Sequence, residues 1–431
     1  MTLPPGPPGP HALHTAGWIL RPGPYSRRLR ERYGDTFTLH VERGRPWVIV
    51  SHPDDVKQVF TGDPDVLHAG EGNAILRPVL GARSLLLLDG AEHIADRKAM
   101  LPAFHGERMQ AYGETIRAIA EREVRSWPAR EPIATRPRMH ALTLEVIMRA
   151  VFGTRDERLR GVLAGLLDWV GDPRLLMLVA LAGPKVLDPA FRRMRAPVDA
   201  LLSEEIARRR AAPDLAQRED ILSLLLQSTG MDDRHLRDEL LTLLVAGHET
   251  TATALAWGLE RLAHHPAAWE RLRTGDEDYL DATCKEVLRL RPVVPAVLRL
   301  LKATLALAGH ELPPGVAIQP NILLMHTRAD VYPDPFAFRP ERFLEQPAGT
   351  YTWIPFGGGV RRCLGASFAL FEMKAVLRAV AAAVERLEPA DARGERPARR
   401  GVTLVPAQEG RVIAARRAAP APRARPVPSG R

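Results

Sequence analysis

The sequence predicts a mainly α-helical fold with small β-sheets, arranged as one large domain. A helical pattern, punctuated by Pro and Gly, continues for some 200 residues from about Gly90 onward. One segment of it can begin at an N-cap Asp232 or Asp233 and run to the stop at His264-His265-Pro266. At roughly 30 residues and 1.5 Å each, this helix would be about 45 Å long and would cross the whole domain. Strand-like runs are short and lie before and after the helical region.

The composition is that of a folded globular protein. The 431 residues include 45% hydrophobic and 26% charged residues, which excludes a wholly disordered or collagen-like chain. The sequence has no run of about 18 apolar residues, so no transmembrane anchor is predicted. The two cysteines, Cys284 and Cys363, are too few for a disulfide framework or a multi-cysteine zinc or iron–sulfur site.

Positive charge is concentrated near the end of the chain. The 60 Lys and Arg exceed the 51 Asp and Glu by nine, and residues 391–431 alone hold ten Arg against three acidic residues. The rest of the chain is close to neutral, which removes the main support for nucleic-acid binding. Residues 418–431 contain only Arg, Ala, Pro, Val, Ser and Gly and are predicted to form a disordered basic tail, which suits contact with an anionic membrane or an acidic partner.

Residues 1–24 are predicted to form a proline-rich lead, because the opening MTLPPGPPGP has few backbone N–H donors. A basic segment followed by a continuous apolar core, the mark of a secretory signal, is not present. Unpaired cysteines suit a reducing compartment, so we expect a cytoplasmic protein. The domain is predicted to span residues 25–417 without a dividing linker.

Short patterns predict the remaining elements. They are a hairpin of residues 36–41 and 47–50 around Gly44, a helix over 279–290 ended by Pro292, short strands near Leu298 and Ala317-Ile318, turns at Pro333, Pro335 and Pro340, a last helix from Cys363 toward Leu387, and a strand pair of 401–405 with 411–414.

The segment from Phe356 to Ala366, FGGGVRRCLGA, is the richest in chemical possibilities. Three consecutive glycines let the backbone approach a neighbour closely, and Cys363 stands just before a helix, whose positive end favours a thiolate together with Arg361 and Arg362. A glycine-rich turn with a structural cysteine would give the same pattern. A dinucleotide fingerprint is excluded because Arg362 occupies the third glycine position, and a P-loop is excluded because Gly-Lys-Ser/Thr is missing.

This segment resembles the haem-ligand loop of the cytochromes P450. The resemblance implies a cytochrome P450 fold with a long central helix over a non-covalently bound haem b, whose axial thiolate is Cys363. It also implies that Phe356 covers the sulfur side, that Gly357 belongs to the loop, that Gly365 allows close packing under the ring, and that Arg361 pairs with a haem propionate.

Two further motifs resemble the same family. Glu286 and Arg289 lie three residues apart on a predicted helix, a spacing that is often only a solvated surface pair. The family's Glu-x-x-Arg pair locks onto a later Arg, here Arg342 in Pro-Glu-Arg-Phe, and fixes the cysteine loop. The pair His93 and Arg97 would be an ordinary helix face in isolation; here it resembles the family's propionate-binding helix, and Arg299 fits the position of another propionate-binding Arg.

Ala246-Gly247-His248-Glu249-Thr250-Thr251 lies in the middle of the long predicted helix. Hydroxyls there can bond back to the preceding turn, and in isolation an ordinary kink would explain the stretch. A zinc-protease motif is excluded because Ala252 stands where the second histidine is required. The stretch resembles the P450 oxygen-activation motif, which implies that Ala246 and Gly247 leave a groove for O2 and that Glu249 and Thr250 relay protons.

The resemblance implies a monooxygenase that inserts one atom of O2 into an organic substrate. Apolar stretches at 74–88, 166–187, 243–245, 293–297 and around Val405 suggest a lipophilic substrate, although core positions would look the same. The chain contains no flavin or iron–sulfur module, so electrons from NAD(P)H are expected to arrive through a ferredoxin and its reductase. The alternatives are a peroxide-driven haem-thiolate enzyme and a non-catalytic haem protein, against which the Glu249-Thr250 pair argues. We expect a monomer that binds no nucleic acid.

Overall fold

The computed structural model describes residues 3–42, 44–104, 107–153, 156–183 and 188–416. Its helices are α1 (His11–Leu20), α2 (Pro22–Tyr33), α3 (Pro53–Thr61), α4 (Ala69–Gly72), α5 (Arg77–Leu80), α6 (Gly90–Met100), α7 (Glu107–Arg125), α8 (Thr135–Phe152), α9 (Glu157–Val170), α10 (Pro173–Ala182), α11 (Asp188–Arg210), α12 (Ile221–Ser228), α13 (Asp233–Ala263), α14 (Pro266–Leu272), α15 (Glu277–Leu290), α16 (Ile322–His326), α17 (Arg342–Glu345) and α18 (Ala366–Ala383). Its strands are β1 (Thr36–Glu42), β2 (Arg45–Val50), β3 (Leu67–His68), β4 (Pro132–Ala134), β5 (Arg299–Leu301), β6 (Leu305–Leu307), β7 (His310–Leu312), β8 (Ala317–Pro320), β9 (Val384–Pro389), β10 (Pro397–Arg400), β11 (Thr403–Pro406) and β12 (Arg411–Arg416).

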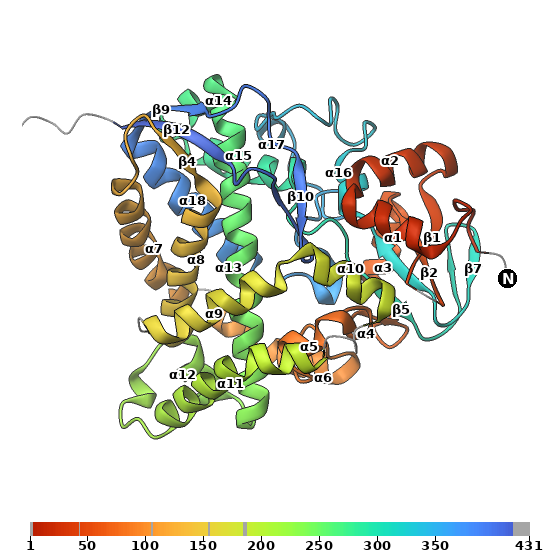
Figure 1. Cartoon of the computed structure of the whole chain (residues 1–431), viewed down its shortest axis with the longest axis horizontal. Coiled ribbons are helices and arrows are strands. Elements are labelled where there is room, and N and C mark those ends of the chain that lie inside the picture. The colour runs from red at the N-terminus through yellow and green to blue at the C-terminus, as the bar shows by residue number, and fades with distance from the viewer. Residues whose placement is uncertain (1–2, 43, 105–106, 154–155, 184–187, 417–431) are drawn as a thin grey trace, which may run out of the picture.

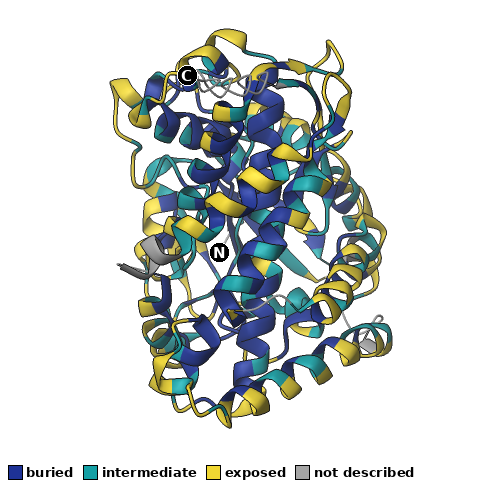
Figure 2. Cartoon of the chain, turned by 90° about the vertical axis from the view of Figure 1, so that its left-hand side faces the viewer, coloured by how far each residue is buried: buried dark blue, intermediate teal, exposed yellow. Residues whose placement is uncertain are grey.

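Helix α13 passes through the centre of the molecule (Figure 1). The side chain of its N-cap Asp232 accepts the His235 N–H at 2.8 Å, and the helix ends before Pro266, so both predicted ends are confirmed. Helices α8, α15 and α18 pack against it and share one hydrophobic core. Buried residues line the interior faces of these helices, and exposed residues lie at the periphery (Figure 2). The predicted fold class, mainly α-helical with small sheets, is confirmed.

The sheets are small and pair segments far apart in the chain. The largest has the order β1-β2-β8-β5-β3 and contains the predicted hairpin, with Phe37 opposite Ile49. The predicted pairing of 401–405 with 411–414 is wrong: β11 pairs with β10, whereas β12 lies between β4 and β9. The last long helix also ends earlier than predicted, at Ala383, and its continuation toward Leu387 is strand β9.

The predicted proline-rich lead, residues 1–24, holds α1 and the start of α2 in the structure. Ile19 of α1 is buried, and Thr15 donates its hydroxyl to the Val41 carbonyl at 2.7 Å, which ties α1 to β1. Even the opening prolines are attached, because the Thr38 hydroxyl bonds to the Pro4 carbonyl at 2.7 Å. The predicted tail, residues 418–431, lies outside the described residues.

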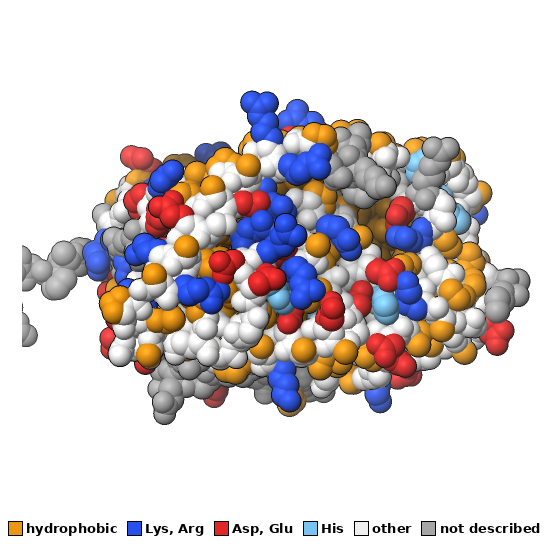
Figure 3. Space-filling view, turned by 90° about the horizontal axis from the view of Figure 1, so that it is seen from below, with side chains coloured by type: hydrophobic (Ala, Val, Ile, Leu, Met, Phe, Trp, Pro, Cys, Tyr) orange, Lys and Arg blue, Asp and Glu red, His pale blue; other side chains and the backbone are white. Residues whose placement is uncertain are grey.

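The surface does not show one dominant charge on the face seen from below. Figure 3 shows Lys and Arg interspersed with Asp and Glu there, as the near-neutral balance of the chain before residue 391 suggests. Among the described residues, no helix combines the length and the apolar character that crossing a membrane requires.

Candidate haem-thiolate active site

The loop before α18 holds Cys363 at its tip. The Cys363 N–H donates to the Phe356 carbonyl at 2.9 Å and closes the loop. Glycine is required here by two contacts with Phe60 of α3: a Cβ on Gly359 (φ +65°) would lie 1.8 Å from the Phe60 carbonyl oxygen, and one on Gly358 would lie 2.2 Å from the Phe60 ring. The glycine run therefore anchors the loop against α3.

Cys363 and two glycines of its loop border open space. The residue is accessible to solvent, although protein atoms surround the sulfur closely. The positions of Gly357 and Gly365 are open, because a Cβ on either would meet no atom within 4 Å. In the middle of α13 Ala246 is exposed, whereas its neighbours Leu244 and His248 are buried. The loop and the central helix therefore both border open space.

The pKa of the Cys363 thiol is raised by burial. The Gly365 N–H and the charges of Arg97 and Arg362 act in the opposite direction without outweighing burial. The predicted contributions of the first-turn N–H group and of Arg362 therefore do favour the thiolate, but burial outweighs them in the chain alone. A bound cation such as iron supplies the additional positive charge that a coordinating thiolate needs.

Four basic side chains converge near this loop. Burial and, to a smaller extent, the charges of Arg361, Arg97 and Arg299 together lower the pKa of His93 to about 3, so the three arginines lie within electrostatic reach of His93. His93 is therefore neutral near pH 7. Arg299 is buried, and burial lowers its pKa to about 10. A concentration of buried positive charge fits an anionic group such as a propionate.

Arg361 is held by protein groups in this structure. It forms an ion pair with Asp89 and donates to the carbonyls of Leu85 and Leu88. Asp89 also accepts the N–H groups of Gly70 and Glu71 at 2.8 and 2.9 Å. Sequence reasoning missed Asp89, which stands one residue before the motif that begins at Gly90. The propionate role of Arg361 stays a prediction.

The Glu286, Arg289 and Arg342 triad forms as predicted. Glu286 accepts the Arg289 Nε at 2.7 Å and Nη2 at 2.8 Å, and the Arg342 Nε at 3.2 Å. All three residues are buried, and Arg289 also donates to backbone carbonyls of the segment after α16. The triad thus joins α15 to the irregular segment that leads into the cysteine loop.

In α13 the hydroxyls bond back to the preceding turn as predicted: Thr250 Oγ1 donates to the Ala246 carbonyl at 2.8 Å, and Thr251 Oγ1 to the Gly247 carbonyl at 3.1 Å. The helix nevertheless continues without interruption from Asp233 to Ala263.

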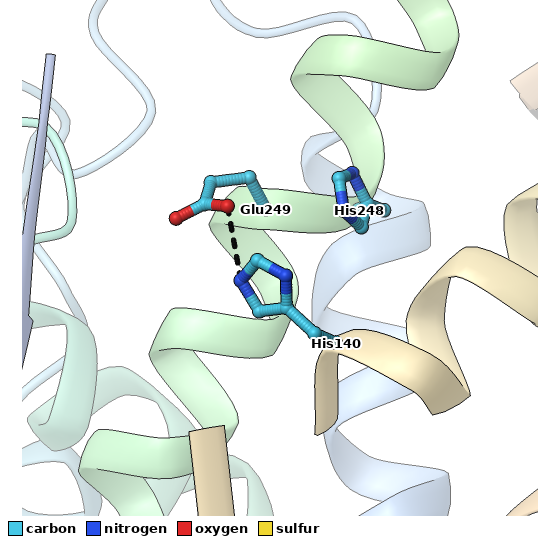
Figure 4. A group of neighbouring side chains, drawn as sticks. All are labelled: His140, His248 and Glu249. Atoms are coloured by element: carbon cyan, nitrogen blue, oxygen red, sulfur yellow. Dashed lines mark ion pairs between the residues drawn. The ribbon is translucent and has the colours of Figure 1, made fainter. Parts of the chain in front are cut away.

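The Glu249 carboxylate makes contacts that the sequence did not indicate (Figure 4). Its Oε2 lies 2.9 Å from His140 Nε2 of α8, and its Oε1 lies 3.5 Å from Arg400 Nε of β10. Burial acts to raise the pKa of Glu249, but the hydrogen bond and charge of His140 and the charges of Arg400 and His248 lower it overall. Glu249 is therefore ionised at neutral pH. More than a hundred residues separate each partner from Glu249, so no local signal could have found them.

The donor set fits haem: one accessible cysteine on a glycine loop, open glycine positions beside it, a basic cluster for propionates, and an open face of α13. When bound, haem supplies the iron at which O2 is reduced. Cys363 is the residue that would hold the iron, and His93, Arg97 and Arg299 would face the propionates. A haem-thiolate protein is the class that this fold and site define.

The family follows from comparison with known proteins. A family model described as Cytochrome P450 matches residues 4–382. Cytochrome P450 135B1 of Mycobacterium tuberculosis is 42% identical over 437 residues, covering 96% of this chain and 91% of the relative. Cytochrome P450 135A1 of the same species is 37% identical, covering 94% and 93%. The solved structure "Retinoic acid bound cyanobacterial CYP120A1" superimposes with a TM-score of 0.84 at 25% identity, covering 96% of this chain and all of that one.

This chain therefore belongs to the cytochrome P450 family of haem-thiolate monooxygenases.

Proposed function

We propose that the protein inserts one atom of O2 into a lipophilic substrate, by hydroxylation or epoxidation, with electrons from NAD(P)H delivered by a ferredoxin and its reductase. The observation that carries the lipophilic substrate is an apolar cluster beside the open part of α13. Val79, Leu80, Leu87 and Phe191 form this cluster, and Leu76, Leu86, Trp169, Val170 and Val245 pack on it.

The cluster joins three regions that the sequence predicted as substrate lining. Val245 immediately precedes the exposed Ala246, so the cluster reaches the exposed part of α13. Trp169 of α9 and Phe191 of α11 pack edge to face with ring centroids 4.6 Å apart. Segment 293–297 is not part of it, since Val293 belongs to the main core. Retinoic acid, bound by the cyanobacterial relative, is itself a lipophilic molecule, which agrees with this proposal.

Within the proposed site the chain has five tasks. Cys363 would hold the iron, and the basic cluster would orient the haem. The apolar cluster would bind substrate and exclude bulk water, which strengthens every electrostatic interaction inside the site. Thr250 Oγ1 would hold a proton donor near the open face of α13, and Glu249 would replenish that proton. Ala246 would leave room for O2.

The electron donor is proposed to dock over the cysteine loop. Arg362 is exposed there beside Cys363, and Val360 is 46% exposed. An exposed cation next to an exposed apolar side chain suits an acidic redox protein.

The test combines binding and turnover. A library of lipophilic compounds is screened for a low-to-high spin shift of the ferric haem. The compounds that bind are then incubated with ferredoxin, reductase, NAD(P)H and ¹⁸O2. Incorporation of one ¹⁸O atom into product supports the proposal. Turnover with peroxide alone, and none with the reductase system, would overturn it in favour of a peroxide-driven enzyme.

A further inference from the structure

We propose that His140 of α8 is the proton donor that reprotonates Glu249. Protons would then enter the site by way of α8. This inference rests on the proposed monooxygenase function. His140 belongs to none of the sequence motifs, and its role follows from its contact with Glu249.

The geometry is that of a proton-transfer pair. His140 Nε2 lies 2.9 Å from Glu249 Oε2, and both side chains are mostly buried, with 17% and 13% of their areas exposed. The two side chains come from different helices and point toward each other (Figure 4). Thr143, one turn further along α8, donates to the His248 carbonyl at 3.1 Å and holds α8 beside this part of α13. Glu249 immediately precedes Thr250, so the pair lies one residue from the hydroxyl that is proposed to hold the proton donor.

Two of the three described neighbours of Glu249 are unsuited to passing a proton. Arg400 is also within 3.5 Å, but a guanidinium stays protonated and therefore contributes charge alone. His248 faces the pair at 5.0 Å between ring centroids, but burial lowers its pKa to about 4 and its Nδ1 lies 3.2 Å from the Leu244 carbonyl. His140 is the remaining candidate, and imidazole is the side chain best suited to the task.

His140 is also connected to the outside. Arg136 Nη1 lies 3.5 Å from His140 Nε2, and Arg136 forms an ion pair with Glu409 at 2.8 Å. The Glu409 side chain is 42% exposed. The His140 side chain is itself 17% exposed, so water can supply a proton to its ring.

The same three side chains, His140, His248 and Glu249, could in principle hold a metal ion. The charges around them argue against it. Arg400 lies 3.5 Å from Glu249 and Arg136 lies 3.5 Å from His140 Nε2, so each of these two ligand groups already has a guanidinium beside it, although Arg400 also pairs with Asp168 and Arg136 with Glu409. A divalent cation there would face strong like-charge repulsion.

The transfer itself is a simple exchange. The proton on His140 Nε2 passes to Glu249 Oε2, which leaves a neutral imidazole and a neutral carboxylic acid. Glu249 gives this proton up toward the Thr250 side and becomes a carboxylate again. His140 then takes a new proton from water, so each cycle moves one proton inward and changes no other bond.

The test compares His140→Gln with the matched control His264→Gln. Glutamine retains a hydrogen-bond donor for Glu249 but cannot relay a proton. His264 pairs with Glu260 at 3.4 Å near the end of the same helix and is 16% exposed, so the control removes a similar His–Glu pair far from the site. We expect His140→Gln to lower product per NAD(P)H about tenfold, a fraction of what general acid catalysis is worth. We also expect a larger solvent deuterium isotope effect and a pH profile that differs from that of the wild type. His264→Gln should match the wild type.

A second readout does not depend on turnover. The carboxyl band of Glu249, identified by infrared difference against Glu249→Gln, is titrated in both histidine variants. Because His140 lowers the pKa of Glu249, the midpoint should rise in His140→Gln and stay unchanged in His264→Gln.

Two results would overturn the inference. The first is an unchanged Glu249 midpoint in His140→Gln, which would show that the contact is absent in solution. The second is a shifted midpoint with wild-type pH profile and isotope effect, which would show that His140 only positions Glu249. Absence of product from the wild type would instead contradict the proposed function and leave the infrared result to decide on the contact.

Discussion

Replacing Glu286 by Gln should be among the most damaging conservative changes in this protein. The substitution keeps the size of the side chain and removes its negative charge. Glu286 is completely buried, and its two oxygens accept four hydrogen bonds from Arg289, Arg342 and the Arg339 backbone N–H. In the variant the amide group would present hydrogens to one of these donors.

The expected cost follows from the charges left behind. Arg289 and Arg342 are 0% and 6% exposed, so both guanidiniums would stay buried without their only carboxylate partner within the described residues. Removing one partner of a buried ion pair typically costs about 3–5 kcal/mol. The backbone carbonyls that Arg289 and Arg342 also contact reduce this cost, because they still accept hydrogen bonds. We therefore expect a loss of about 3 kcal/mol or more of unfolding free energy.

Urea denaturation, followed by haem absorbance and circular dichroism, measures this loss. Glu277→Gln is the control: Glu277 lies on the same helix and pairs with Arg378, but the two side chains are 60% and 52% exposed. Such a surface pair contributes about 1 kcal/mol or less. If Glu286→Gln lowered the unfolding free energy no more than Glu277→Gln, the triad would not stabilise the segment that leads into the cysteine loop.

Two further predictions concern α13. Thr250→Ala should lower the product formed per NAD(P)H on the order of tenfold and release peroxide. Thr251→Ala, at a buried position, should leave this ratio unchanged. Equal effects of the two variants would refute the relay role of Thr250. Burial, together with the charges of Asp96 and Asp238, raises the pKa of Glu239 to about 8. The unfolded protein loses the Glu239 proton above about pH 4.5, whereas the folded protein keeps it up to about pH 8. The free energy of unfolding therefore falls progressively between these two pH values. Urea titrations at pH 5 and pH 8 measure this effect. Glu239→Gln should have the same unfolding free energy as the wild type at pH 5 and exceed it by a few kcal/mol at pH 8. Equal stability of the two proteins at pH 8 would contradict the raised pKa of Glu239.

The features that short stretches of sequence determine, such as helix ends and pairs on one helix face, could be predicted. Asp232 caps α13 and Pro266 follows its end, so the ends of the long helix could be read from single residues. The spacing of Glu286 and Arg289 placed both on one face of a helix, and the triad followed from the family resemblance.

Non-local pairing could not be predicted in the same way. Strand β12 pairs with β4, more than 270 residues earlier, and β4 has only three residues. The end of α18 carries no glycine or proline, so the change from helix to strand at Val384 left no mark in the sequence. His140 and Arg400 reach Glu249 through the packing of α8 and β10 around α13, which only the folded structure reveals.

We propose that Cys363 holds the iron of a bound haem through its sulfur. The most direct measurement is the absorbance spectrum of the reduced protein with carbon monoxide, recorded for the wild type and for Cys363→Ser. We predict the strongly red-shifted Soret band of a thiolate-ligated haem in the wild type and its loss in the variant. A Soret band of the histidine-ligated type in the wild type, or a red-shifted band that persists without Cys363, would contradict the account.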